Sequence, residues 1–179
     1  MSVLDFLSPS RCAPAALASP LARALAGRDA PSLRDLSLDG KVEIRGDLDV
    51  VEHTDGDEFV RLSPRRGLLL TTRDPSEVAE RLRAGGVRAY DVTGALAGLA
   101  LEGERLLRRL TDLDLDALPA AGGFARIGAI LVRDEGERFR VYFPQELGHY
   151  VAEVVLGTLA GLDNTGSDPT GPTPGGGAT

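Results

Sequence analysis

The sequence has few of the residues on which cross-links, metal centres and acid–base catalysis commonly depend. Its 179 residues include one cysteine, two histidines, no tryptophan and a single lysine, Lys41. The lone Cys12 excludes a disulfide within the chain and leaves a thiolate metal site without further ligands. Few side chains can therefore change charge near neutral pH. These absences argue against a disulfide-stabilised, zinc-bound or histidine-based catalytic protein.

Long apolar runs and concentrated positive charge are absent as well. No stretch approaches the roughly 20 apolar residues of a membrane span, since even the triple leucine at residues 68–70 lies between Arg66 and Arg73. The start of the chain shows no basic segment followed by a continuous apolar block. A net charge of -7 disfavours a nucleic-acid partner, which would require clustered basic side chains. We therefore expect a cytoplasmic protein with neither membrane nor nucleic acid as a partner.

Composition divides the chain into three parts. Residues 1–35 are rich in Ala and Pro, and we expect a partly helical N-terminal arm from three leucines at four-residue spacing, Leu17, Leu21 and Leu25. Residues 36–162 carry enough apolar residues to form one domain with its own core. Residues 163–179 contain a single aliphatic residue, Ala178, and are predicted to be a disordered tail.

Alternating and helical patterns predict the elements of the central part. Strands are expected at residues 41–45, 59–62, 68–72, 87–91, 96–101, 125–132 and 138–143. One helix is expected after Asp74, where Pro75 and Glu77 complete a helix-start signature. Two more are expected from Gly103 and from Pro144, with a loop over residues 111–119 and a break at Gly122-Gly123.

This order of elements predicts an α+β fold in which helices pack on antiparallel sheets. It is neither a βαβ repeat nor an all-β meander. Two successive units, roughly residues 41–86 and 87–162, each resemble a ferredoxin-like split motif.

Three aspartates in the loop over residues 111–119 are the first candidates for chemistry. Asp112, Asp114 and Asp116 alternate with leucines, so in an extended segment the acids share one side. Such a set can orient an amine, act as a base or bind a hard cation. The alternative is a solvated face on a loop that its leucines anchor in the core. An EF-hand is excluded because the required Gly and terminal Glu are missing.

Other catalytic and cofactor motifs are weak. His53 lies in an acidic turn and His149 on the polar side of the last helix, and both are typical of surface residues. Gly94, Gly98 and Gly103 do not form a dinucleotide-binding fingerprint, so no nucleotide cofactor is expected on this chain.

Several short segments resemble the folate-binding fold of glycine-cleavage aminomethyltransferases. They are Tyr-Asp-Val-Thr at residues 90–93, Leu-Ala-Leu-Glu-Gly at 99–103, Asp-Leu-Asp-Ala-Leu-Pro at 114–119, and Gly122. With Ser19-Pro20-Leu21, the Val-Glu-Ile-Arg-Gly strand at 42–46 and Leu62-Ser63-Pro64, the chain is most similar to the gamma subunit of heterotetrameric sarcosine oxidases.

The resemblance implies a non-catalytic subunit of an amine oxidoreductase complex in one-carbon metabolism. Its partners would be larger flavoprotein subunits, and FAD, FMN, NAD and tetrahydrofolate would be bound by those other subunits. By the match to the Leu-Thr-Asn-Asp loop of the aminomethyltransferases, Asp114 corresponds to the acid that handles the folate amine, although this chain has an extra residue there. Two alternatives stay open: a stand-alone module that binds tetrahydrofolate, and a structural domain without ligand.

Overall fold

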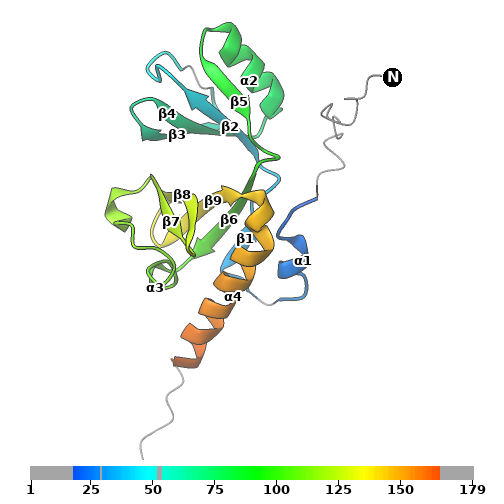
Figure 1. Ribbon diagram of the computed structural model, residues 1–179, viewed down its shortest axis with the longest axis vertical. Coiled ribbons are helices and arrows are strands. Elements are labelled where there is room, and N and C mark those ends of the chain that lie inside the picture. The colour runs from blue at the N-terminus through cyan, green and yellow to red at the C-terminus, as the bar shows by residue number, and fades with distance from the viewer. Residues whose placement is uncertain (1–17, 29, 52–53, 166–179) are drawn as a thin grey trace, which may run out of the picture.

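The structure of the protein is a computed structural model that describes residues 18–165, except residues 29, 52 and 53 (Figure 1). Cys12, Leu17 and His53 lie outside the described residues, as do residues 166–179 of the expected tail. Two antiparallel sheets lie one above the other, and helices cover the face of each sheet that points away from the other. The α+β class expected from the sequence is confirmed.

The four-stranded sheet has the strand order β3-β4-β2-β5 and carries one helix. Its elements are β2 (Gly40–Arg45), β3 (Asp57–Ser63), β4 (Arg66–Thr71), α2 (Pro75–Ala84) and β5 (Arg88–Asp91). The Asp74 carboxylate accepts hydrogen bonds from the amides of Ser76 and Glu77, so the predicted helix start is confirmed.

The five-stranded sheet has the order β1-β6-β9-β8-β7. Its strands are β1 (Leu33–Asp35), β6 (Leu96–Glu102), β7 (Ala120–Phe124), β8 (Ile127–Arg133) and β9 (Arg138–Pro144). The helices associated with it are α1 (Ala22–Leu25), α3 (Glu104–Leu107) and α4 (Gly148–Thr165), with short 3-10 turns η3 (Leu115–Ala117) and η4 (Gln145–Leu147). Helix α4 thus reaches three residues into the segment expected to be a tail.

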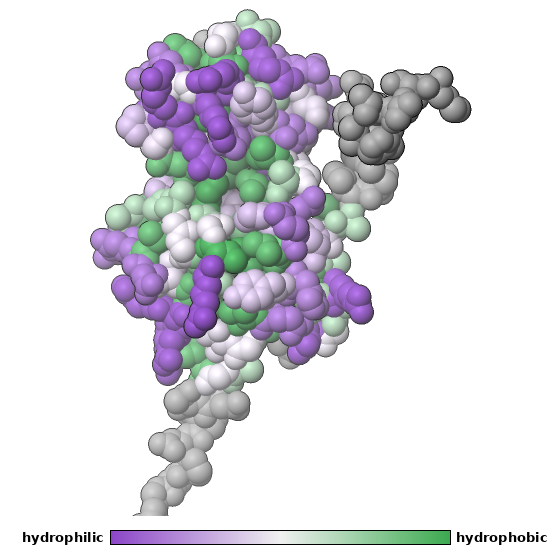
Figure 2. Space-filling view, viewed as in Figure 1, coloured by the Kyte–Doolittle hydropathy of each residue, from purple (hydrophilic) through white to green (hydrophobic). Residues whose placement is uncertain are grey.

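Alternation along the central strands explains how both sheets are buried on both faces. In β4, Leu69 packs with α2, whereas Leu68 and Leu70 point toward the five-stranded sheet. In β9, Phe139, Val141 and Phe143 pack under the helices. The layer between the sheets consists of six buried residues, Val60, Leu68, Leu70, Ile130, Val132 and Tyr142. Figure 2 shows hydrophobic surface in the band between the two sheets and hydrophilic surface over the four-stranded sheet.

The structure corrects two parts of the sequence-based organisation. Strand β5 pairs with β2, so the boundary between the two units falls after Asp91 and not before Val87. Strand β7 was not predicted, because Gly122-Gly123 looked like a break. The close approach of Leu113 explains why β7 has a glycine at position 122. A Cβ there would come within 2.6 Å of the leucine Cδ2.

The ends of three predicted elements also differ. Ala125 lies in the turn between β7 and β8, and not in the strand expected from it onward. Helix α3 ends at Leu107, and the last α-helix begins at Gly148 after a 3-10 turn. Within the described residues, no helix is long and apolar enough to cross a membrane.

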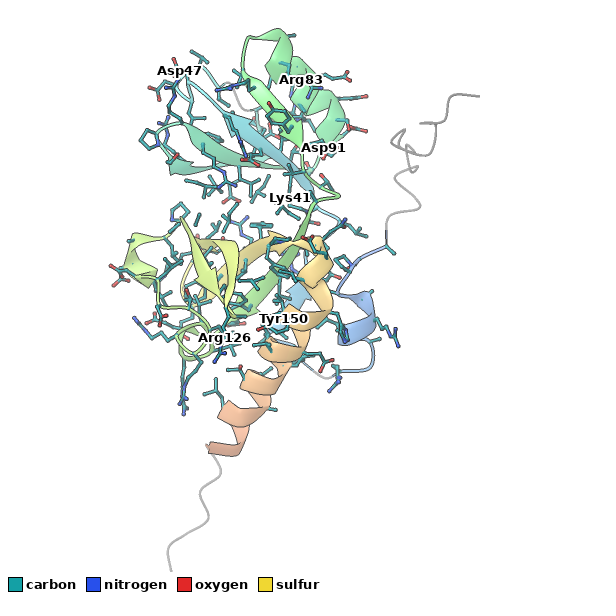
Figure 3. All side chains as sticks on the ribbon, viewed as in Figure 1. Lys41, Asp47, Arg83, Asp91, Arg126 and Tyr150 are labelled. Atoms are coloured by element: carbon teal, nitrogen blue, oxygen red, sulfur yellow. The ribbon has the colours of Figure 1, made fainter. Side chains whose placement is uncertain are left out.

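Lys41 stands where the chain passes between the two sheets, near Asp91 in Figure 3. Its side chain is fully buried, and its Nζ donates hydrogen bonds to the carbonyls of Leu36 (3.3 Å), Ser37 (3.0 Å) and Asp39 (2.5 Å). These carbonyls belong to the loop that leads from β1 to β2, the first passage between the sheets.

The backbone of the same residue holds the second passage. The amide of Lys41 donates to Thr93 Oγ1 (3.0 Å), and its carbonyl accepts from the amide of Val92 (2.9 Å). Both residues lie in the segment from β5 to β6. One residue therefore fixes the two points at which the chain changes sheets.

We expect Lys41→Met to lower the free energy of unfolding by about 2 kcal/mol in urea denaturation. The substitution removes three hydrogen bonds, at about 1 kcal/mol each, although the Leu36 carbonyl keeps the Asp39 amide as a donor at 3.1 Å, and the relief from burying a charge offsets part of this loss. Arg65→Met is a suitable control because Arg65 is exposed on the β3–β4 turn. An unchanged stability of Lys41→Met would contradict the assigned role.

The pH dependence of stability provides a second readout of the same variant. Burial lowers the pKa of Lys41 from 10.5 to about 8, while Asp39, Asp91 and Asp35 partly oppose this change. The unfolded chain thus binds this proton more tightly, so the contribution of Lys41 to stability rises with pH between about 8 and 10.5. Lys41→Met should lose this rise, by comparison with the wild type across the same pH range.

Candidate functional site

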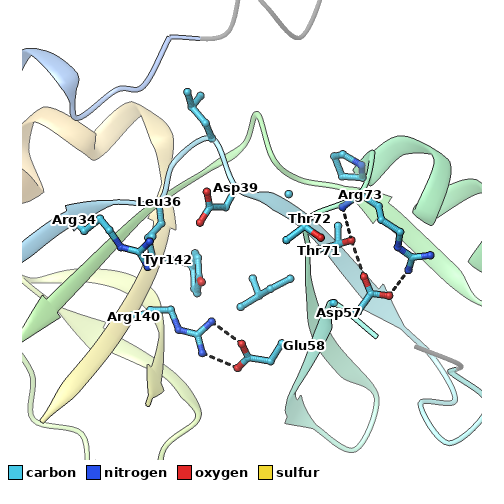
Figure 4. A pocket seen from close by; sticks show the side chains of 15 residues that line it. Arg34, Leu36, Asp39, Asp57, Glu58, Thr71, Thr72, Arg73, Arg140 and Tyr142 are labelled. Carbon is cyan, nitrogen blue, oxygen red and sulfur yellow. Dashed lines mark hydrogen bonds and ion pairs between the residues drawn. The ribbon is translucent and has the colours of Figure 1, made fainter. Parts of the chain in front are cut away.

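A cleft of about 580 Å³ opens between the two sheets, next to the loop that Lys41 holds (Figure 4). Its walls come from β1 and the following loop, from the neighbouring ends of β3 and β4, and from β9. The charged and hydroxyl-bearing side chains that line it are Arg34, Asp39, Asp57, Glu58, Thr71, Thr72, Arg73, Arg140 and Tyr142. It brings acids, arginines and a tyrosine from distant parts of the sequence into one place.

Asp57 is the most enclosed acid of the cleft. Its side chain is 0% exposed, and it accepts hydrogen bonds from Thr71 Oγ1 (2.7 Å), from the amide of Thr54 (3.3 Å) and from Arg73 Nη2. Burial alone would raise the pKa of Asp57, but these hydrogen bonds and the charge of Arg73 lower it below its ordinary value. The carboxylate is therefore ionised at neutral pH, and the stability it contributes is lost only in acid, as the pH falls through its pKa.

Arg140 of β9 joins the two sheets through an ion-pair clasp with Glu58 of β3. Its Nη1 and Nη2 donate to the two Glu58 oxygens at 2.8 and 2.6 Å, and Nε and Nη2 donate to Asp134 at 2.9 and 2.5 Å. Burial alone would lower the pKa of Arg140, but the two carboxylates raise it above its ordinary value. The Arg140 side chain is 13% exposed and the Glu58 side chain 51%, so solvent screens the clasp in part, less than a pair in which both side chains are exposed.

Tyr142 lies on the floor of the cleft and is 2% exposed. Burial raises its pKa to about 12, although the neighbouring Arg140 acts in the opposite direction. The phenol therefore keeps its proton across the physiological range. It is available as a hydrogen-bond group and not as a base.

The chemistry of the cleft is dominated by acid–arginine pairs, although one buried atom within them, Arg73 Nε, has no hydrogen-bond partner among the described residues. Asp57 and Glu58 are both held by arginines, which leaves neither carboxylate suited to take a proton near neutral pH. Among the described lining residues, Arg34 and the Asp39 carboxylate form no ion pair or hydrogen bond. The arrangement can hold the two sheets together and offer a charged rim to a partner.

The three aspartates expected as candidates lie away from this cleft. Asp114 is exposed and caps the 3-10 turn η3, accepting a hydrogen bond from the amide of Asp116 at 3.1 Å. Asp116 pairs with Arg133 at 2.9 Å, and Asp112 lines a separate cavity near α4. The three carboxylates therefore serve different neighbours.

The remaining candidate, His149, is exposed near the start of α4. In the described part of the chain, no three His, Cys, Asp or Glu side chains are grouped so that they could hold a metal ion. The cleft residues were missed by sequence reasoning because Glu58 and Arg140 lie 82 positions apart. The one local signal is the position of the two charges. Glu58 and Arg140 each lie on the strand face whose neighbouring residues are apolar and point toward the opposite sheet.

Comparison with known proteins gives a likeness of fold. Neither the known protein families nor the curated proteins contain a match. A chain of the heterotetrameric sarcosine oxidase from Corynebacterium sp. U-96, solved in complex with pyrrole 2-carboxylate, superposes with a TM-score of 0.67 and 16% identity. The match covers 81% of this chain and 95% of that chain. The two chains share a fold.

A second solved structure is much less similar. Aspartokinase III from E. coli, in complex with lysine and aspartate, superposes with a TM-score of 0.40 and 14% identity over 71% of this chain and 32% of that one. A likeness at this level supports no inference.

We expect the Glu58–Arg140 clasp to show a coupling energy of about 1 kcal/mol in a double-mutant cycle. The cycle compares Glu58→Gln, Arg140→Met and the double variant by urea denaturation. The single substitution Arg140→Met should lower the free energy of unfolding by about 2–4 kcal/mol, more than Glu58→Gln, because it also leaves the partly buried Asp134 without its partner.

The exposed pair Arg138–Glu135 provides the matched control, since it also joins an arginine of β9 to an acid but lies at 3.6 Å in solvent. Its coupling should fall within a few tenths of a kcal/mol of zero. Equal coupling in the two cycles would show that the clasp does not hold the sheets together.

Proposed function

We propose that this chain is a gamma-type, non-catalytic subunit of a heteromeric, sarcosine-oxidase-like amine oxidoreductase. The observation that carries the proposal is the shared fold with a chain of heterotetrameric sarcosine oxidase, at a TM-score of 0.67 over 95% of that chain. Because most of both chains is covered, the two are similar in length. This agrees with the sequence resemblance, which points to the short gamma subunit and not to a larger chain of the complex.

The chemistry of the cleft supports a role without catalysis. The acids of its walls are paired with Arg73 and Arg140, and Tyr142 keeps its proton. Under this proposal, FAD, FMN, NAD and tetrahydrofolate belong to larger flavoprotein subunits in the cytoplasm, and this chain contributes a docking surface. The pairs make that surface rigid, which lowers the entropy lost on assembly.

Two exposed apolar residues are candidates for the contact with a flavoprotein subunit. Leu38 and Val50 are each 56% exposed, more than the other large hydrophobic residues that the structure describes as exposed. Leu38 lines the cleft, whereas Val50 lies in the segment between β2 and β3. Their equal exposure makes them a matched pair for locating the partner.

Co-expression with large subunits of the sarcosine-oxidase type should yield a flavin-coloured complex that contains this chain on size-exclusion chromatography. Leu38→Asp should weaken that complex by at least roughly tenfold in Kd, because a charge in an interface must be desolvated. Val50→Asp serves as the control. A stronger effect of Val50→Asp would move the contact to the segment between β2 and β3, and a colourless chain that elutes alone would contradict the proposal.

A stand-alone folate-binding module is the second candidate, and the exposure of Asp114 is what favours it. Its carboxylate makes one hydrogen bond within the described residues, to the Asp116 amide, so its charge is accessible to an amine. However, Asp114 lines none of the four cavities described for this chain. A pterin ring would thus meet this carboxylate outside the described cavities, which makes the subunit proposal the stronger one.

Asp114→Asn separates these two candidates. Asparagine is as good a helix cap as aspartate, so the turn should be kept while the negative charge is removed. Under the subunit proposal, titration calorimetry should show no tetrahydrofolate binding to the wild-type chain or to the variant. Measurable binding that falls at least roughly tenfold in Asp114→Asn, and not in Asp112→Asn, would favour the folate module.

A further inference from the structure

A second cavity, of about 600 Å³, lies on the helical side of the five-stranded sheet, away from the cleft. Three parts of the chain form it: the segment after α3, the turn between β7 and β8, and α4. Its apolar lining includes Leu110, Leu113 and Val154, and its volume is in the range of small-molecule sites. Neither the fold likeness nor the proposed subunit role assigns it a ligand.

The turn at the edge of this cavity has an unusual backbone. Phe124 pairs with Ile127, so Ala125 and Arg126 alone form the turn, and both have positive φ angles of 47° and 66°. Such two-residue turns favour Asn and Gly, since a Cβ disfavours this conformation. A strained conformation of this kind persists only where its surroundings impose it.

The other two walls of the cavity impose it here. The amide of Ala125 donates to the carbonyl of Leu110 at 2.7 Å, and the hydroxyl of Tyr150 on α4 donates to the carbonyl of Ala125 at 2.9 Å. Figure 3 labels Arg126 on the turn and Tyr150 on α4, and both side chains line the cavity. The three walls are therefore fixed to one another through Ala125, the neighbour of Arg126 in the turn.

Two arginines at this cavity lack an internal counter-charge. Arg109 and Arg126 both line it, and neither forms an ion pair or side-chain hydrogen bond within the described residues. Nine of the described arginines form ion pairs, among them Arg108, the neighbour of Arg109, whereas Arg109 and Arg126 belong to the nine that do not. The cavity also contains one acid, Asp112, so its net charge is positive in a chain whose total is -7.

The hydroxyl groups around the cavity are already used as donors. Tyr150 donates to Ala125, Thr111 donates to the carbonyl of Gly123 at 2.5 Å, and Thr158 donates to the carbonyl of Val154 at 2.8 Å. Their oxygens can still accept hydrogen bonds, but the side-chain groups left to donate to a ligand are the two guanidinium groups. A ligand with anionic oxygens matches that pattern.

We propose that this cavity binds a small organic anion, with a carboxylate or phosphate head group held by Arg109 and Arg126 and an apolar body against Leu110, Leu113 and Val154. The strained turn places one of the two cations, and Asp112 at the rim sets an upper limit on the negative charge that the site accepts. Guanidinium groups bind carboxylates and phosphates through paired hydrogen bonds, so both heads fit the same two residues.

Titration calorimetry on the full chain tests this with three probes that share a phenyl body: phenylacetate, phenyl phosphate and the neutral phenylacetamide. We expect one or both anions to bind with a Kd of about 1 mM or tighter, and the amide to bind at least roughly tenfold more weakly. The anion with the lower Kd shows whether the site prefers a carboxylate or a phosphate head group. Absence of anion binding, or equal binding of the amide, would overturn the proposal.

Variants assign the binding to this cavity. Arg109→Gln and Arg126→Gln should each weaken the tighter anion by about tenfold, and Asp112→Asn should strengthen it by removing a like charge. Arg105→Gln is the matched control, because Arg105 is exposed on α3 and does not line the cavity. Thermal unfolding confirms that each variant is folded. A loss in Arg105→Gln equal to that in the other two would show unspecific attraction and sink the assignment.

Discussion

The fold depends on one buried ammonium group at the place where the chain changes sheets. Both passages, from β1 to β2 and from β5 to β6, meet at Lys41, whose side chain holds the first and whose backbone holds the second. In a chain that otherwise uses arginine for its basic residues, the compact ammonium suits this position. It presents three donors to three carbonyls that converge on one point, which the planar guanidinium cannot do.

The layer between the sheets is thin, and this explains why charge is used beside it. Six buried residues form that layer, whereas the helical side of the five-stranded sheet buries a much larger set. The clasp of Arg140 with Glu58 lies at the rim of the layer, where a pair is partly shielded from water. Such a pair adds orientation as well as attraction, because two parallel hydrogen bonds fix the planes of both groups. The cleft is thus held at a fixed width by the residues that line it.

Local signals in the sequence were sufficient for most elements and failed at particular places. The helix that Asp74 begins, and strands such as β2, follow from capping and alternation within a few residues. Strand β7 could not be predicted, because its glycines are explained only by Leu113, which packs over Gly122. The turn at Ala125 and Arg126 has none of the usual turn residues, since contacts with Leu110 and Tyr150 hold it in place. The place of β5 in the four-stranded sheet likewise depends on its pairing with β2, which the periodicity of apolar residues does not encode.

The candidate site was harder to predict than the fold, for the same reason. The acids that stand out in the sequence are neighbours along the chain but do not act together in space: Asp112 lines a cavity, Asp114 caps a 3-10 turn and Asp116 pairs with Arg133. The residues of the cleft are far apart along the chain, and only the stacking of the two sheets brings Arg140 to Glu58. A sequence pattern can reveal residues that act together when they are close along the chain. Here the paired charges come from different sheets, so no pattern connects them.

Strand β1, which comes before the four-stranded sheet in the chain, pairs with β6 of the five-stranded sheet, which comes after it. Leu33 faces Leu101 and Asp35 faces Leu99, although β1 precedes the whole four-stranded sheet in the chain. During synthesis, this strand leaves the ribosome before its partner exists, and the entire first unit is made while it waits. A gene fragment that ended at Asp91 would encode a complete four-stranded sheet together with one orphan strand. The two halves therefore cannot be inherited or exchanged as separate modules without a new strand to take the place of β1.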